Sequence, residues 1–183
     1  MLEFDGYGII SNIESPIAKD LQFLNGIKYI PGVQSINFKS GAYIYYRDDK
    51  IYLYKFPKKD KKEWIFDYDK DGSLIRITEI TNGSRTMYHM YDGNVKYYID
   101  TEGTKFSYTY NMLDTVCIKT GEIYKLEYHL NSDHGITVKQ TYYPSICDIE
   151  HAVRTEIVYE KHRVIKMRIF VGNEKTADIN YIY

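Results

Sequence analysis

Acidic residues at alternate positions near residue 70 are the first group in this sequence that could do chemistry. Asp67, Asp69 and Asp71 precede Gly72, and a calcium loop begins in this way because alternate carboxylates converge on one cation. The twelfth position of such a loop should supply a bidentate glutamate, but it is Thr78 here. The flanking residues alternate as strands do, so we interpret the segment as a solvated hairpin turn and predict no metal site.

The five histidines and two cysteines have no spacing that predicts a metal or catalytic centre. No two histidines stand four residues apart, and Cys117 and Cys147 form no Cys-x-x-Cys pair. The sequence also lacks a glycine-rich phosphate loop, a Gly-x-Ser-x-Gly elbow and a His-Glu-x-x-His motif. We therefore predict a protein that is not an enzyme, has no cofactor and keeps its thiols reduced. Dispersed residues that meet only in space would escape this search.

Lys58, Lys59, Lys61 and Lys62 surround Asp60 and form a local basic cluster. Basic residues beside aromatic strands suit single-stranded nucleic acid. The cluster also lies where a hairpin tip is expected, and lysines at a tip are solvated and discourage edge pairing. Because the whole chain has a formal net charge of −1, we favour the hairpin tip and disfavour nucleic acid as a partner.

Tyrosine is the residue that most distinguishes this composition, with 21 Tyr against 7 Phe and 1 Trp. Neighbouring residues of a strand point to opposite faces, so closely spaced tyrosines cannot all be buried. Rigid amphipathic rings are favoured anchors in protein interfaces, and they also stack on sugars and bases. We predict a binding surface formed by six of them: Tyr45, Tyr46, Tyr52, Tyr54, Tyr97 and Tyr98.

Length and composition fit a single soluble domain. A chain of 183 residues with 44% apolar and 27% charged residues can bury an ordinary core. The N-terminus has no basic region followed by an apolar run, and no stretch is long and apolar enough to span a membrane, so we expect a cytoplasmic protein. We expect three parts in one domain over 1–183: an N-terminal helix and strand cap (1–42), repeated β-hairpins (43–143), and an irregular segment with the final strands (144–183).

Turn-forming residues recur about every ten residues from residue 43 onward. Four pairs place glycine where a two-residue hairpin needs a positive φ: Asp71-Gly72, Asn82-Gly83, Asp92-Gly93 and Glu102-Gly103. Further turns are expected at Asp48-Asp49, Lys59-Asp60, Leu113-Asp114, Thr120-Gly121, Asp133-His134-Gly135 and Gly172-Asn173. The segments between these turns alternate with a period of two, which predicts an antiparallel meander.

One short helix is expected near the N-terminus. Ser15 suits the N-cap, Pro16 the first turn, and Gly26 the position after the end. A meander of ten or more strands has an apolar face that must be covered, and its twist accumulates. We therefore expect an all-β fold in which the meander curls into a partly closed barrel or a folded-over sheet, with the helix at one end or over a face.

Between about residues 42 and 143, units of about twenty residues open with an aromatic-x-aromatic pattern. They begin at Tyr43-Ile44-Tyr45, Phe66-Asp67-Tyr68-Asp69, Tyr88-His89-Met90-Tyr91-Asp92, Tyr108-Thr109-Tyr110 and Tyr128-His129-Leu130. This pattern resembles the YD or RHS repeat family, and Phe66 to Leu74 followed by Asn82-Gly83 matches it best. The resemblance implies a spiral-sheet geometry, and it brings no activity and no functional residue with it.

These observations predict a non-catalytic protein-binding domain with a protein as its partner and no contact with a membrane. The repeat resemblance and the composition rich in Ile, Lys and Tyr favour an intracellular inhibitor, an immunity-type protein or a phage anti-defence protein. Two alternatives stay open. One is a structural or carbohydrate-binding module of a larger assembly, in which tyrosines stack on sugar rings; the other is a small-molecule-binding or enzymatic β-barrel.

Overall fold

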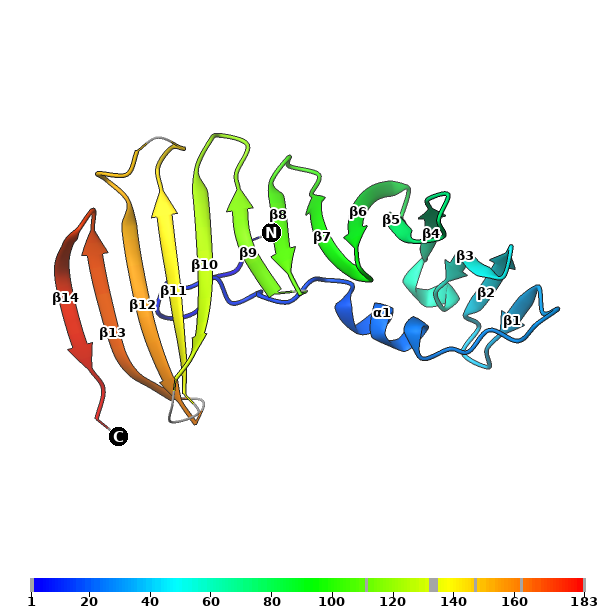
Figure 1. Ribbon diagram of the computed structural model, residues 1–183, viewed down its shortest axis with the longest axis horizontal. Coiled ribbons are helices and arrows are strands. Elements are labelled where there is room, and N and C mark those ends of the chain that lie inside the picture. Colours follow the sequence, from blue (N-terminus) through cyan, green and yellow to red (C-terminus); the bar gives the residue numbers. More distant parts are fainter. Residues whose placement is uncertain (1, 111, 132–134, 147, 162, 183) are drawn as a thin grey trace. The chain divides into compact units, whose positions relative to one another are not determined.

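The computed structural model describes residues 2–110, 112–131, 135–146, 148–161 and 163–182. Its strands form one antiparallel sheet in which each strand pairs with its neighbours in the chain (Figure 1). The strands are β1 (Ser35–Asn37), β2 (Tyr43–Arg47), β3 (Lys50–Lys55), β4 (Lys62–Tyr68), β5 (Leu74–Thr81), β6 (Ser84–Tyr91), β7 (Asn94–Ile99), β8 (Lys105–Thr109), β9 (Met112–Cys117), β10 (Ile123–Leu130), β11 (Ile136–Tyr143), β12 (Val153–Glu160), β13 (Arg163–Val171) and β14 (Glu174–Asn180). The helices are α1 (Ala18–Asn25) and a short 3-10 turn, η1 (Lys58–Asp60). The predicted all-β meander is confirmed.

The sheet is not closed into a barrel, because β1 and β14 are the two ends of the strand order. The expectation of a partly closed barrel is therefore corrected. Segments that lie outside the strands cover the apolar face instead, as described below for each unit. The covering segments remove the need for the sheet to close on itself.

The chain divides into two compact units, which we describe separately. Unit 1 contains Met1–Ile13, Glu102–Ser107 and Met112–Tyr183. Unit 2 contains Glu14–Thr101 and Tyr108–Asn111. The single-domain organisation over 1–183 stays a prediction.

Tight turns set the register of the meander. Asn82 and Gly83 have φ values of 51° and 86°, and Asp92 and Gly93 have values of 49° and 72°. Two consecutive positive φ values are typical of the type I′ turn, whose twist matches that of the flanking strands. These turn predictions are confirmed, and so is Gly172-Asn173, which connects β13 to β14.

The predicted two-residue hairpins at Asp71-Gly72 and Glu102-Gly103 are longer connections, 69–73 and 100–104, and one further predicted turn is wrong. Leu113 and Asp114 lie inside β9, and the side chain of Leu113 is fully buried. The chain turns earlier, at Tyr110, which has a φ of 51°. Burial of a leucine therefore outweighed the turn preference of the aspartate after it. The predicted turn at 133–135 and the predicted thiol at 147 fall wholly or partly outside the described residues.

Helix α1 starts later than the sequence indicates. Its N-terminal boundary is Ile17, which makes no side-chain cap, and the carbonyl of Ser15 accepts a hydrogen bond from the amide of Ala18 at 3.0 Å. The predicted N-cap at Ser15 is therefore wrong. The backbone carbonyl of Ser15, and not its hydroxyl, accepts the hydrogen bond from the first amide of the helix. The helix ends at Asn25, and Gly26 follows it as predicted.

Unit 2 buries one face of its strands beneath α1 and the segment after it. Phe66, Ile77, Tyr88 and Tyr98 form a row of direct cross-strand neighbours, and all four are buried. The helix contributes its own buried leucines, Leu21 and Leu24. The segment after α1 adds rings and main-chain bonds, because Tyr29 packs on Tyr46 with ring centroids 5.3 Å apart and the Tyr46 amide donates to the Gln34 carbonyl at 2.9 Å.

A polar cluster ties α1 to the covered face of unit 2. The fully buried Trp64 donates its indole N–H to Glu79 at 2.8 Å. The ammonium of Lys62 lies 3.1 Å from the Glu79 carboxylate and 3.5 Å from that of Asp20 on α1. Lys62 therefore belongs to the packed face, which corrects the expectation that the whole lysine cluster is solvated, whereas Lys58, Lys59 and Lys61 are exposed.

Unit 1 buries one face of its strands beneath the N-terminal segment. Ile9 packs into a cluster with Val138, Ile157 and Val164. The buried side chain of Gln140 fixes this segment, because it accepts from the amide of Ile10 at 2.8 Å and donates to the carbonyl of Gly8 at 2.9 Å. A buried amide with both ends bonded specifies one position for the segment.

Candidate functional site

An uncharged row of side chains crosses strands β2 to β6 on the face of unit 2 opposite its buried face. Tyr45, Leu53, Ile65, Thr78 and Met87 are direct cross-strand neighbours in this order. The first four are half-buried, and Met87 is 49% exposed. We call this row the open stripe. Its members lie within reach of one another across the strands, so they form one continuous surface.

A β-bulge places a second tyrosine beside the open stripe. On β3, Leu53 pairs with Tyr45 and Ile51 pairs with Tyr46, which leaves Tyr52 as the extra residue. Simple alternation from Tyr54 would put Tyr52 on the covered face. The bulge instead directs the Tyr52 ring to the open face, because a bulge interrupts the alternation of side chains.

The Tyr52 ring lies between Tyr45 and Arg47. The two tyrosine rings meet edge to face, with centroids 6.2 Å apart and an interplanar angle of 79°. The guanidinium carbon of Arg47 lies 3.8 Å from the centroid of the Tyr52 ring. Stacking of a guanidinium on a ring holds both groups in place while the donor N–H groups stay available to a partner.

A second row borders the open stripe along β4 to β7. Asp67, Arg76, His89 and Tyr97 are successive cross-strand neighbours. The Arg76 guanidinium donates to the Asp67 carboxylate at 2.8 Å. The rings of His89 and Tyr97 stack with centroids 4.2 Å apart and planes only 12° from parallel. This border therefore offers a flat ring pair next to a fixed ion pair.

The opposite border of the open stripe has a second ion pair and one further arginine. Tyr43, Lys55, Glu63, Ile80 and Arg85 are cross-strand neighbours there, and Lys55 pairs with Glu63 at 3.4 Å. Across the two borders, three basic side chains, Arg76, Lys55 and Arg85, face two carboxylates, Asp67 and Glu63, and Arg47 over the Tyr52 ring adds a fourth cation. The surface around the open stripe is therefore apolar at its centre and positive at its rim.

The six tyrosines predicted as a binding surface separate into two groups. Tyr46, Tyr54 and Tyr98 are buried. Burial raises the pKa of all three phenols, and that of Tyr98 reaches about 12. Tyr45, Tyr52 and Tyr97 are half-buried and lie on the open face. The buried three belong to the core of unit 2, so the open three are the members that a partner could contact.

Two of the three acidic residues that resemble the start of a calcium loop have partners for their carboxylates within the protein. Asp67 accepts from Arg76 on the open face. Asp69 caps its own turn, because its Oδ1 accepts from the amides of Asp71 at 3.0 Å and Ser73 at 2.8 Å. Among the residues that the structure describes, no three of His, Cys, Asp and Glu lie close enough together to hold a metal ion.

Unit 1 has a row of five on its own open face, and this row is charged. Glu127, Lys139, Glu156, Arg168 and Asp178 are successive cross-strand neighbours from β10 to β14. Their charges alternate in sign at every step. Arg168 lies 3.4 Å from Glu156, and Lys139 lies 3.9 Å from Glu127. We call this row the charge ladder.

The charge ladder has further partners on the same face. Arg154 lies 3.3 Å from the Glu156 carboxylate. Lys175 and Lys166 lie 2.9 Å and 3.3 Å from Asp178, and their hydrogen bonds lower the pKa of this carboxyl, Lys175 having the larger effect. The carboxylates of Glu156 and Asp178 thus each contact two cations of the protein itself.

Sequence comparison does not assign the chain to a family: no protein-family model and no curated protein matches it. The resemblance to YD or RHS repeats therefore stays a prediction. No helix in the described ranges has the length and apolar character needed to cross a membrane.

Sequence reasoning missed four members of the open stripe, because it considered only rings. Leu53, Ile65, Thr78 and Met87 have no distinctive type. A signal was nevertheless present, since the Asn82-Gly83 turn fixes the register of β5 against β6 and so pairs Thr78 with Met87. The position of Tyr52 had no such signal, because it depends on the bulge.

Proposed function

We propose that this chain is a non-catalytic protein-binding domain that contacts its partner through the open stripe and its two borders. The observation that carries the proposal is the uncharged row Tyr45, Leu53, Ile65, Thr78 and Met87 on an uncovered face. Continuous apolar surface with a polar rim is typical of protein interaction sites.

The flanking side chains indicate what kind of partner fits. The groups of the Arg47–Tyr52 pair and of the His89–Tyr97 pair are already stacked on each other, so less conformational entropy is lost when a partner packs on them. Tyrosine and arginine are also the residue types that most often dominate binding energy. The positive rim favours a protein surface with apolar side chains at its centre and Asp or Glu around them.

The role as an inhibitor, an immunity-type protein or a phage anti-defence protein is a narrower form of this proposal. A blocking protein needs a rigid surface that matches its target, and paired strands with stacked rings provide one. The identity of the target decides between these roles, and binding through the open stripe is common to all of them.

Affinity capture from extract of the native host, with three forms of the protein as bait, tests the proposal. The stripe variant carries Tyr52→Ala and Met87→Ser, which remove exposed apolar area and leave the buried face intact. The control variant carries Thr137→Ala and Thr141→Ala on β11 in unit 1. Far-UV circular dichroism and thermal unfolding establish that both variants fold. Isothermal titration with the purified captured protein then gives the affinities.

We expect one protein to bind the wild type and the control variant equally and to bind the stripe variant at least about tenfold more weakly. Equal binding by all three forms would contradict the proposal. Retention of a glycan in place of a protein, lost in the stripe variant, would instead support the carbohydrate-binding alternative.

Single alanine variants of the tyrosines separate the core from the contact surface. Tyr54→Ala should lower the free energy of unfolding by about 3 kcal/mol, because its ring is buried against Trp64 and Phe56. Tyr52→Ala should cost about 1 kcal/mol or less and act mainly on partner binding. Urea denaturation of each variant checks this. Equal losses for the two would mean that Tyr52 is a core residue.

A further inference from the structure

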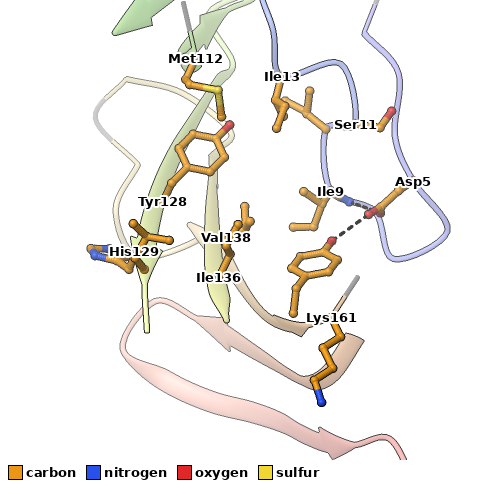
Figure 2. A pocket seen from close by; sticks show the side chains of 13 residues that line it. Asp5, Ile9, Ser11, Ile13, Met112, Tyr128, His129, Ile136, Val138 and Lys161 are labelled. Carbon is orange, nitrogen blue, oxygen red and sulfur yellow. Dashed lines mark hydrogen bonds between the residues drawn. The ribbon is translucent and has the colours of Figure 1, made fainter. Parts of the chain in front are cut away.

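Unit 1 has a cavity, partly open to solvent, between its N-terminal segment and the covered face of β9 to β12. Its volume is about 690 Å³, which lies within the range of small-molecule sites. Ile9, Ile13, Met112, Tyr128, Ile136 and Val138 supply apolar walls (Figure 2). The N-terminal segment forms one wall and is held by Gln140, so the cavity is preformed.

Asp5, Tyr128 and Tyr159 supply polar groups to the cavity, and Ser11 also lines it. Asp5 uses Oδ1 to accept from the amides of Tyr7 and Ile9, each at 2.9 Å. Its second oxygen accepts from the Tyr159 hydroxyl at a long 3.4 Å. The Tyr128 hydroxyl donates to the carbonyl of Leu113 at 3.0 Å, so it faces a ligand as an acceptor.

The remaining charged residues of the cavity wall have side chains directed elsewhere. Figure 2 shows the His129 ring and the Lys161 amine turned away from the space beside Ile9 and Val138. The His129 ring lies 3.4 Å from Glu127, a member of the charge ladder on the opposite face. A ligand inside the cavity therefore meets acceptor groups and a carboxylate, with no cation among these side chains directed at it.

We propose that this cavity binds one compact, mostly apolar, uncharged molecule that carries a hydrogen-bond donor, such as a hydroxyl or an N–H group. The donor meets the second oxygen of Asp5, whose hydrogen bond from Tyr159 is long, while the apolar body fills the space between Ile9, Tyr128 and Val138. Burial, together with Asp5, raises the pKa of Tyr159 to about 12, so its proton is retained at neutral pH. The site lies in unit 1 and is independent of the open stripe.

Two fluorescent probes that share one ring system test both the cavity and its ligand class. N-phenyl-1-naphthylamine is uncharged and has one N–H donor. 8-Anilinonaphthalene-1-sulfonate has the same skeleton with an added sulfonate, which the Asp5 carboxylate and the apolar walls disfavour. We expect the first probe to bind the wild-type chain saturably, one per chain, and the second to bind about tenfold more weakly.

Substitutions assign the binding to this cavity. Val138→Phe or Ile136→Trp fills the space and should weaken binding of the uncharged probe about tenfold or more. Thr141→Phe is the matched control, because it adds a ring to the same strand on the opposite face. Asp5→Asn keeps the shape of the side chain and removes its charge, so the affinities of the two probes should converge. Circular dichroism shows which variants fold. Two filling variants are used so that the test still works if one of them does not fold.

The outcome is decisive in either direction. Saturable binding of the uncharged probe that is lost in a folded filling variant and kept in Thr141→Phe supports the site. Unchanged binding in every folded filling variant, no saturable binding by the wild type, or equal affinity of the wild type for both probes would overturn the proposal.

Discussion

The open stripe of unit 2 and the charge ladder of unit 1 are built alike and differ in chemistry. Each is a row of five direct cross-strand neighbours on the uncovered face of five consecutive strands. In the charge ladder, each carboxylate has at least one cation of the same chain within 4 Å. In the open stripe, no member is charged. The same architecture thus yields one face whose charges are paired within the chain and one face that leaves apolar area for a partner.

This difference explains how a single sheet can remain stable while part of it stays available for binding. Long charged side chains cover the strands beneath them and pair across the ladder, which stabilises an uncovered face without a second layer. The open stripe lacks this pairing and gains its order from stacked rings at its borders. In this account the charge ladder contributes to stability and the open stripe contributes to binding.

Among changes to the two rows, the largest expected effect comes from breaking the charge ladder at its centre. Glu156→Leu leaves Arg154, Arg168 and Lys139 without the carboxylate between them. Because the Glu156 side chain is only 11% exposed, we expect the free energy of unfolding to fall by about 2 kcal/mol. Urea denaturation followed by circular dichroism measures this loss.

Glu63→Leu beside the open stripe is the matched control. Its ion pair with Lys55 is more exposed, with 33% and 54% of the two side chains accessible, so its loss should cost less than about 0.5 kcal/mol. Equal effects of the two substitutions would remove the distinction between the self-paired face and the open one.

The same substitution in both units should have opposite consequences. Thr78→Glu introduces a charge at the centre of the open stripe, between Ile65 and Met87, and should weaken binding of an acidic-rimmed partner about tenfold. Thr141→Glu introduces it between Lys125 and Arg154, its cross-strand neighbours in unit 1, and should be neutral or stabilise by a few tenths of a kcal/mol. Isothermal titration and thermal unfolding give the two readouts. A loss of partner affinity in Thr141→Glu would contradict the assignment.

The smallest effect concerns the pKa of Asp178. Its carboxyl has a lowered pKa in the folded chain, so its contribution to stability is present above the ordinary aspartate pKa and is lost as the pH falls through the lowered value. Lys175→Met should raise the pKa of Asp178 towards its ordinary value, as carbon-detected NMR titration would show. The open stripe contains no acid, so the protection factors of the amides around Thr78, which are corrected for the intrinsic pH dependence of exchange, should not change over the same acidic range. An unshifted pKa would mean that Lys175 does not act on Asp178.

Local sequence signals predicted the meander and half of the tyrosine assignment. Turns such as Asn82-Gly83 fix the register, and alternation then separates Tyr45 from Tyr46. The side of the sheet on which Tyr52 lies could not be predicted, because a bulge depends on how two strands pair and twist and not on the residue itself. The pair Leu113-Asp114 was misinterpreted as a turn for a related reason. Burial of the leucine in a strand outweighed the turn preference of the aspartate.

Long-range packing was beyond the reach of periodicity. The N-terminal segment is held by Gln140, which lies 130 residues from Ile10 in the sequence. The cavity of unit 1 results from this contact, since the segment supplies one of its walls. No local pattern around either residue indicates that the two meet.

A photo-crosslinking amino acid placed at Thr78, and in a second protein at Thr141, tests most directly which face binds. Both positions are half-buried on uncovered faces, so the two proteins differ in the row that is probed. We predict a crosslinked product with the captured partner from position 78 and none from position 141. A product from position 141 alone, or from neither position while the partner is bound, would contradict the central claim that the open stripe is the contact surface.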